Sequence, residues 1–156
     1  MGKADIAVAS PKIYPRLFTV EEANGLLAVL KPLMARASQR IELLRRRSRS
    51  TVRRDELDPE SGDFMEKLQQ DPGVAQAIKE LHELVQEIHD LGCICKGVEE
   101  GLVDFPCSLG EEIVFLCWRY GEETVAHWHR VEDGFAGRRP LLDAGENEAG
   151  GSRSYH

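Results

Sequence analysis

The most constraining feature of this sequence is a long, regularly spaced row of apolar residues near its start. Successive members are separated by alternating steps of three and four residues: Val20, Ala23, Leu27, Leu30, Met34, Ala37, Ile41 and Leu44. This spacing predicts one long helix with a coiled-coil-like apolar stripe. Thr19 and Glu22 occupy the positions of a capping box, so we expect the helix to cover about residues 19–54. Pro32 lies off the stripe and is expected to kink the helix without ending it.

A second stripe of the same kind lies further along the chain. Its members are Val74, Ile78, Leu81, Val85, Ile88, Gly92 and Cys95. Asp71 followed by Pro72 is typical of a helix start, Gly92 is typical of a helix end, and Phe64 adds an apolar position upstream. We therefore predict a second helix over about residues 64–92 that packs antiparallel to the first in a two-helix hairpin.

The charge of the chain is unevenly distributed. The formal net charge of -7 argues against attraction of the whole protein to nucleic acid. Residues 1–54 carry 12 Lys and Arg against 4 Asp and Glu, whereas residues 55–100 carry 3 against 13. In the predicted hairpin a basic first helix lies along an acidic second one, so pairing of these charges explains most of the asymmetry.

Arginines gather at the end of the first predicted helix, beyond the last member of its apolar stripe. They are Arg45, Arg46, Arg47, Arg49, Arg53 and Arg54. One hypothesis is a phosphate-contacting arm for nucleic acid. The other is a solvated helix end that the acidic residues after Arg54 partly neutralise. No aromatic residue is interleaved with the arginines, so this segment offers no platform for base stacking.

The second half of the chain shows the residue pattern that is typical of β-strands. Residues 112–120 are β-branched and aromatic, and shorter apolar runs lie at 93–98, 102–105 and 124–131, with Pro106 ending the second of these. We predict a three- to four-stranded antiparallel meander over about residues 93–131, one face of which the helical hairpin covers. The expected organisation is a mobile segment at 1–15, a single α+β domain at 16–144 and a disordered tail at 145–156.

Two histidines suggest a metal site in this predicted sheet. His127 and His129 are two residues apart on a strand, so they share a face and can offer two ligands to a metal such as zinc. The turn at residues 121–123 allows two strand registers. One places no ligand opposite the pair, whereas the other places Cys117 opposite His127 and lets Asp104 approach. The alternative is that the histidines are ordinary surface or hydrogen-bonded core residues, and that Cys117 is an inert core thiol.

The loop after the last predicted strand offers a second candidate site. Arg138 and Arg139 follow two glycines, and guanidinium groups beside a flexible backbone can hold a phosphate or a carboxylate. Glu122 is a candidate member of a polar cluster in the same region. The alternative is that these arginines pair with carboxylates of the chain itself.

The cysteine pattern and the N-terminus predict a cytoplasmic protein. No Cys-x-x-Cys pair exists among the four cysteines, no apolar signal peptide precedes residue 16, and no apolar run is long enough to span a membrane. We therefore expect reduced thiols and no contact with a membrane.

Five short motifs occur in a fixed order along the chain. They are Thr19-Val20-Glu21-Glu22-Ala23-Asn24, Gly101-Leu102-Val103-Asp104-Phe105-Pro106, Leu116-Cys117-Trp118 with Gly121-Glu122, Trp128-His129, and Gly134-Phe135-Ala136-Gly137-Arg138. In this order they resemble the bacterial family catalogued as domain of unknown function 2203, over roughly residues 16–142. The resemblance implies a single cytoplasmic domain with a helical hairpin and a small sheet, and it implies no activity and no catalytic residues.

These observations favour a non-enzymatic module that self-associates or binds a protein partner, with no predicted cofactor. The alternative is a metal- or anion-binding protein, with or without enzymatic activity, whose site is built from Asp104, Glu122, His127, His129 and Arg138. The second alternative is nucleic-acid contact through the segment 45–54. Convergence of the five polar side chains in one place would favour the first alternative.

Overall fold

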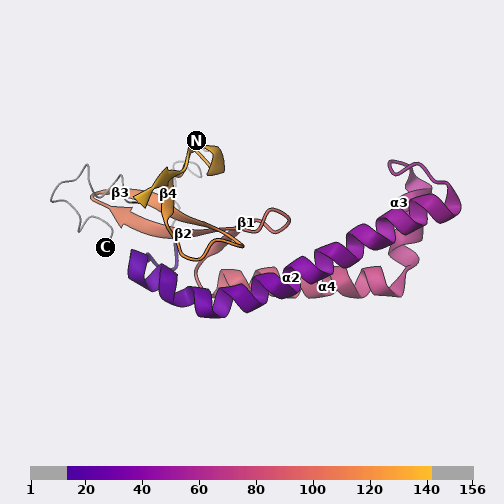
Figure 1. The fold of residues 1–156 in the computed structure, drawn as a ribbon, viewed down its shortest axis with the longest axis horizontal. Coiled ribbons are helices and arrows are strands. Elements are labelled where there is room, and N and C mark those ends of the chain that lie inside the picture. Colours follow the sequence, from indigo (N-terminus) through magenta and orange to yellow (C-terminus); the bar gives the residue numbers. More distant parts are fainter. Residues whose placement is uncertain (1–13, 142–156) are drawn as a thin grey trace, which may run out of the picture.

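The computed structural model describes residues 14–141 as an α+β fold in which helices lie on one face of an antiparallel sheet (Figure 1). The elements in chain order are α2 (Val20–Asp55), α3 (Gly62–Gln70), α4 (Pro72–Asp90), β1 (Ile94–Gly97), β2 (Leu102–Leu109), β3 (Glu112–Arg119), β4 (His127–Arg130), the 3-10 turn η1 (Phe135–Gly137) and β5 (Arg139–Pro140). The predicted α+β class is confirmed. Of the predicted mobile segment 1–15 and tail 145–156, all but residues 14 and 15 lie outside the described residues.

The long first helix forms as its apolar stripe predicts. The Thr19 hydroxyl accepts a hydrogen bond from the backbone N–H of Glu22 at 3.0 Å, and the Glu22 carboxylate accepts one from the backbone N–H of Thr19 at 3.1 Å. The helix continues through Pro32 and ends at Asp55, and Figure 1 shows it as a bent helix. Its stripe supplies much of the core that lies beneath the sheet.

The predicted helix over residues 64–92 is wrong as a single element, because it is two helices, α3 and α4. The break falls at Asp71, whose backbone is extended at φ -79° and ψ 114°. Pro72 causes it: a proline disfavours helical backbone in the residue before it and lacks the N–H that would continue the ladder. The Asp71 carboxylate then caps α4 by accepting from the backbone N–H of Gly73 at 2.9 Å. The hairpin therefore has a third, short helix at its tip.

Opposite charges pair between α2 and α4, as the uneven charge distribution predicts. Arg40 forms an ion pair with Glu80, and Arg36 lies 3.9 Å from Glu87. Arg47, from the arginine-rich segment, contacts both carboxylate oxygens of Asp71 at 2.6 and 2.7 Å. This contact holds the pKa of Asp71 below its usual value and ties the end of α2 to the start of α4.

The sheet has five antiparallel strands in the order β1-β2-β3-β4-β5, one more than the predicted three to four. The additional strand, β5, has two residues, which is too short for any periodicity. Strand β2 continues through Pro106 to Leu109, which corrects the expectation that Pro106 ends it. The missing N–H costs no ladder bond there, because β1 pairs only with residues 102–104 and the carbonyl of Pro106 faces the free edge, where it accepts from the backbone N–H of Phe18 at 2.7 Å.

The register of β3 and β4 is the second of the two predicted registers. Cys117 pairs with His127, and Leu116 with Trp128. Strand β4 begins only at His127, so the expectation of a strand from residue 124 is wrong for its first three residues. In that irregular stretch Val125 enters the core, and its backbone N–H donates to the Asn24 side chain at 2.7 Å.

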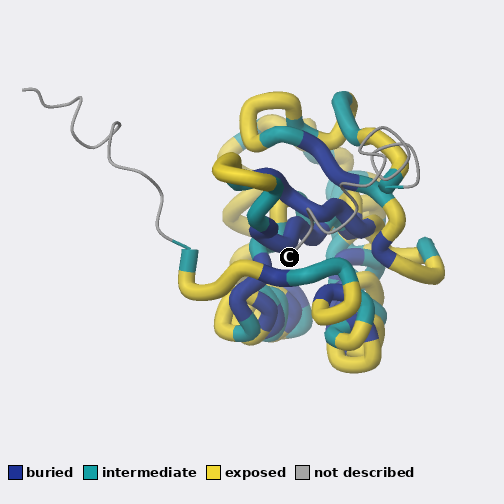
Figure 2. The backbone as a smooth tube through the Cα atoms, turned by 90° about the vertical axis from the view of Figure 1, so that its left-hand side faces the viewer, coloured by how far each residue is buried: buried dark blue, intermediate teal, exposed yellow. Residues whose placement is uncertain are grey.

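Both faces of the sheet are buried at its centre. The inner face packs on the helices through Val103, Phe105, Cys107, Val114, Leu116, Trp118 and Trp128. In Figure 2 the buried parts of the strands and of the helices face one another. The outer face carries the alternate residues, and there the ring of Phe115 meets Tyr14 edge-on at 5.8 Å.

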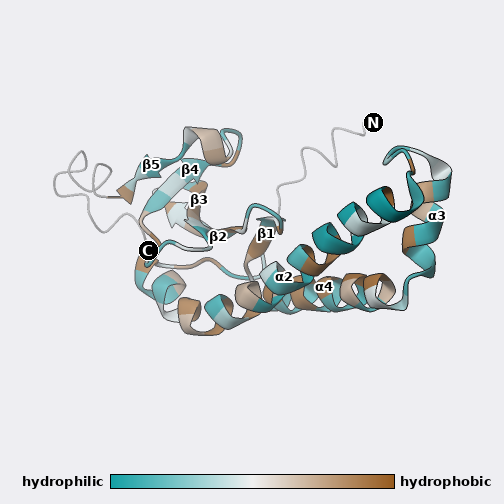
Figure 3. Ribbon diagram, turned by 45° about the vertical axis from the view of Figure 1, so that its right-hand side comes forward, coloured by the Kyte–Doolittle hydropathy of each residue, from teal (hydrophilic) through white to brown (hydrophobic). Residues whose placement is uncertain are grey.

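The tip of the hairpin extends beyond the sheet. Figures 1 and 3 show α3 and the adjoining parts of α2 and α4 on one side, with no strand above them. Within residues 14–141, no helix combines the length and the apolar character that crossing a membrane requires.

Candidate metal centre on the outer face of the sheet

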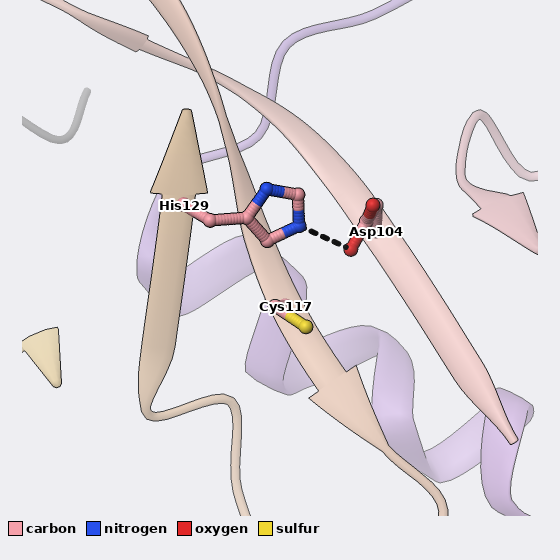
Figure 4. A group of neighbouring side chains, drawn as sticks. All are labelled: Asp104, Cys117 and His129. Carbon is pink, nitrogen blue, oxygen red and sulfur yellow. Dashed lines mark hydrogen bonds and ion pairs between the residues drawn. The ribbon is translucent and has the colours of Figure 1, made fainter. Parts of the chain in front are cut away.

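Three chemically active side chains meet on the outer face. Asp104 lies on β2, Cys117 on β3 and His129 on β4 (Figure 4). The register brings them together, since Asp104 pairs directly with Cys117, and His129 pairs with Phe115, two residues from Cys117 on the same face. One ligand atom from each residue lies within 4.8 Å of the others. We call this group the Asp–Cys–His cluster.

The cluster is buried from solvent. The exposed fractions of Asp104, Cys117 and His129 are 2%, 1% and 2%. Taking a charged group this far from water is costly unless a partner of opposite charge compensates. The arrangement of atoms around the imidazole shows which compensation the site provides.

Hydrogen bonding fixes the state of the His129 ring. Nδ1 lies 2.8 Å from the carbonyl oxygen of Arg130, and because a carbonyl can only accept, Nδ1 carries a hydrogen. Nε2 lies 3.3 Å from Oδ1 of Asp104. A neutral ring protonated at Nδ1 would aim the lone pair of Nε2 at a carboxylate oxygen, which is repulsive. A proton or a metal ion must therefore lie between Nε2 and Oδ1 of Asp104.

With a proton at that place, His129 is an imidazolium ion. Burial opposes its charge, but the contacts with Asp104, Cys117 and the Arg130 carbonyl outweigh burial and raise the pKa of His129 to about 10. The contacts around His129 thus favour a proton on the imidazole, and a metal ion would have to displace that proton to bind.

A second layer of charges surrounds the cluster. Nζ of Lys96 lies 3.9 Å from Oδ2 of Asp104, the oxygen that does not face His129. A guanidinium nitrogen of Arg138 lies 3.8 Å from Sγ of Cys117, and the same guanidinium forms a two-pronged ion pair with Glu122. Burial raises the pKa of Glu122, but the hydrogen bonds from Arg138 and from the backbone N–H of Arg119, together with the nearby positive charge of Arg138, outweigh burial and lower this pKa below its usual value.

A small cavity of about 120 Å³ adjoins the cluster. Its lining comprises Lys96, Leu102, Asp104, Cys117, His129, Gly134 and Phe135. The wall formed by Phe135 is fixed by Arg138, whose guanidinium lies 4.5 Å from the centre of that ring. The cavity has room for one or a few small molecules next to the buried ligand atoms.

The structure brings together most of the predicted site residues. Glu122 and Arg138 adjoin the cluster, whereas His127 stands outside it, and its buried Nδ1 has no hydrogen-bond partner among residues 14–141. Arg139 lies elsewhere, 5.3 Å from the centre of the Trp128 ring, so the two arginines do not form one anion site. Sequence reasoning missed Lys96, for which only the alternation of β1 offered a hint, and the Arg130 carbonyl, for which no pattern exists.

The fold and the site define a small α+β protein with a carboxylate, a thiol and an imidazole buried together on the outer face of its sheet. The chain belongs to the family of uncharacterised conserved proteins known as domain of unknown function 2203, whose family model matches residues 16–141. The resemblance drawn from the five motifs is thereby confirmed. Comparisons with curated proteins and with solved structures find no match.

Proposed function

We propose that the protein binds a transition-metal ion, most simply Zn²⁺, through Asp104, Cys117 and His129. One observation carries the proposal: the carboxylate oxygen of Asp104 and the sulfur of Cys117 converge on the Nε2 side of an imidazole whose other nitrogen donates to a backbone carbonyl. Metal-binding histidines usually donate their second nitrogen to a carbonyl or a carboxylate, which orients the ring.

The ligand set suits zinc in type and in spacing. Thiolate, imidazole and carboxylate are its usual ligands, and bonds of about 2.0–2.3 Å in a tetrahedron place ligand atoms about 3.2–3.6 Å apart. Nε2 and Oδ1 already lie 3.3 Å apart, and the remaining separations are at most 4.8 Å.

Three protein ligands leave a fourth position, which the adjoining cavity of about 120 Å³ can supply with water or a small ligand. Lys96 would hold the non-coordinating oxygen of Asp104 and so favour coordination through one oxygen. An open fourth position is typical of catalytic rather than structural zinc, so the proposal includes chemistry at the metal without naming a substrate.

The same three residue types also form nucleophile–base–acid triads, but this arrangement does not suit one. In such a triad the nucleophile and the carboxylate contact opposite nitrogens of the imidazole. Here Nδ1 of His129 is taken by a carbonyl, so Asp104 and Cys117 share Nε2, and Cys117 is 1% exposed. The geometry therefore favours a ligand role for Cys117 over a nucleophilic one.

Metal titration of the full, untagged chain tests the proposal. After treatment with a chelator, we expect one Zn²⁺ or Co²⁺ per chain and, with Co²⁺, a thiolate-to-metal charge-transfer band. Cys117→Ser abolishes the band, and His129→Ala or Asp104→Asn weakens binding by more than about 100-fold, since even outer partners of metal ligands contribute about 10–100-fold. Cys95→Ser is the matched control, because Cys95 lies on β1 outside the cluster.

The competing occupant of the site is a proton, and nuclear magnetic resonance distinguishes the two. If Zn²⁺ binds, the Nε2 resonance of His129 shifts at pH 7 when one equivalent is added. Sub-stoichiometric metal, equal affinity in Cys117→Ser and Cys95→Ser, or an imidazolium signal unaltered by excess Zn²⁺ would each refute the proposal.

A second candidate function is that of an interaction module. The tip of the hairpin supports it, because the sheet leaves that part of α2 uncovered and large apolar side chains there are exposed, among them Met65 at 50% and Ile78 at 41%. No disulfide joins the four cysteines, all of which lie within residues 14–141, and this suits a reducing compartment such as the cytoplasm. Sedimentation of the chain alone and with candidate partners tests this role, and a strict monomer without a partner would dismiss it.

A further inference from the structure

A continuous groove runs along α2 from the sheet to the tip of the hairpin. It consists of two adjoining hollows of about 370 and 510 Å³ that share Ser48 and Arg49. The first lies between α2, α4 and the β1–β2 turn, and the second lies between α2, the loop before α3 and α3 itself. The lining comprises Ile41, Leu44, Arg45, Ser48, Arg49, Val52, Arg53, Pro59, Phe64, Leu81, Val98 and Glu99. We call it the α2 groove.

The floor of the α2 groove is apolar and its rim is basic. Leu44, Val52 and Phe64 contribute to the floor. Three arginines of the rim, Arg45, Arg49 and Arg53, are spaced by four residues, which places them about 6 Å apart along one side of the helix. A row of cations beside an apolar strip matches a ligand with an apolar stripe and carboxylates next to it.

Two of these arginines keep their charge uncompensated within the described part of the chain. Arg49 lies 3.5 Å from Glu42, whereas neither Arg45 nor Arg53 has a carboxylate of residues 14–141 within 4.0 Å. By contrast, Arg47, which faces α4 instead of the groove, is fully paired with Asp71. The groove therefore presents the unpaired cations of an otherwise well-paired hairpin.

We propose that the α2 groove binds an amphipathic helix of a partner protein, with Asp and Glu flanking its apolar stripe. The proposal gives a partner class to the interaction role above, on which it rests, and it is independent of the metal site. Residues 41–53 span about 18 Å, enough to hold about three turns of a docked helix. Glu99 closes the sheet end, so the acidic residues of the partner helix lie toward the tip.

The charges favour this occupant over a second copy of the chain. Two-fold antiparallel pairing of two α2 grooves would set Arg45 of one copy against Arg53 of the other, and like charges in direct opposition are unfavourable. Nucleic acid is favoured less because the floor is apolar and its one aromatic ring, Phe64, is 6% exposed and offers no stacking surface.

A helix library tests the proposal with the full chain as bait. Each 18-residue helix has leucines at every third and fourth position, and the flanking positions are randomised between Glu and Lys. We expect selection to enrich Glu by about tenfold or more, which corresponds to about 1.4 kcal/mol. The triple variant Arg45→Glu, Arg49→Glu, Arg53→Glu should invert the preference to Lys. Arg46→Glu, which changes an exposed arginine outside the groove, should leave it unaltered.

Three results would overturn the inference: no retained helix, a Glu preference that persists in the triple variant, or a 20-nucleotide RNA that binds the groove and displaces the selected helix. Because all three arginines are exposed, we expect the variants to fold like the native chain. Circular dichroism checks that they do. Sedimentation distinguishes failure of the α2 groove proposal from failure of the more general interaction role. A self-associating chain that retains no helix contradicts only the α2 groove, whereas a monomer that retains none contradicts both.

Discussion

The two faces of the sheet are both buried at its centre, but they bury different kinds of side chain. On the inner face, Val103, Leu116 and Trp118 are fully buried against the helices and bury only carbon, apart from one indole N–H that donates to the Glu122 carbonyl at 2.9 Å. On the outer face, the alternate positions of the same strands bury a carboxylate, a thiol and an imidazole, with exposed fractions of at most 2%.

This difference separates stability from function. Burial of apolar surface contributes about 25 cal/mol per Å², so the inner face is what holds the sheet on the hairpin. A buried ion pair barely offsets its own desolvation, and an apolar replacement of both partners is often neutral or stabilising. The outer face is therefore expected to gain little net stability from Asp104 and His129, which agrees with the metal-binding role proposed above.

The largest expected effect is on the inner face. Trp118→Ala removes a fully buried ring and one hydrogen bond. We expect it to lower the free energy of unfolding by about 3–5 kcal/mol, as large-to-small core changes do. Urea denaturation monitored by circular dichroism measures the change. A loss below about 1 kcal/mol would mean that this face is not the principal source of stability.

A double-mutant cycle on the outer face should give a different result. Asp104→Val alone leaves an imidazole in an apolar site without its carboxylate, and we expect a loss of about 3 kcal/mol. His129→Leu added to that change should restore the free energy of unfolding to within about 1 kcal/mol of the native protein. The same double variant should bind no Zn²⁺.

That combination of restored stability and lost metal binding is the signature of a site kept for chemistry. If the double variant is as unstable as the sum of its single changes, then Asp104 and His129 are structural, and the contrast between the two faces fails. His127→Leu is the control, because His127 lies on the same face of β4 but outside the Asp–Cys–His cluster.

The helical half was predictable from the sequence because its information is local. The stripe from Val20 to Leu44 and the capping box determine α2 through spacing alone. The start of α4 at Asp71 was equally local, since Asp71 followed by Pro72 is typical of a helix start, and the prediction over residues 64–92 erred by extending one helix back through this start. The path of β2 through Pro106 was not predictable, because it depends on where β1 stops pairing.

The sequence predicted which residues could belong to the site, but not how they are arranged. Shared faces follow from alternation, so His129, Cys117 and Asp104 were all candidates. Their convergence depends on the register set by the turn at Gly121, for which two alternatives stood open. His129 rather than His127 belongs to the Asp–Cys–His cluster, and its ring is oriented by the backbone carbonyl of Arg130. Every residue has a backbone carbonyl, so the sequence does not predict this contact.

The smallest expected effect lies at the rim of the outer face, where Glu122 pairs with Arg138. The side chains are 28% and 16% exposed, so the pair contributes at most about 1 kcal/mol. Because the folded protein lowers the pKa of Glu122, the contribution is present above the unfolded value of about 4.3 and disappears as the pH falls through the lowered folded value. The difference in unfolding free energy between the native protein and Glu122→Gln should therefore be largest at pH 7 and vanish near pH 2. If the difference in unfolding free energy were the same at pH 7 and at pH 2, the charge of Glu122 would not contribute to stability. The rim would then differ from the centre of the outer face, where we expect the charges of Asp104 and His129 to matter.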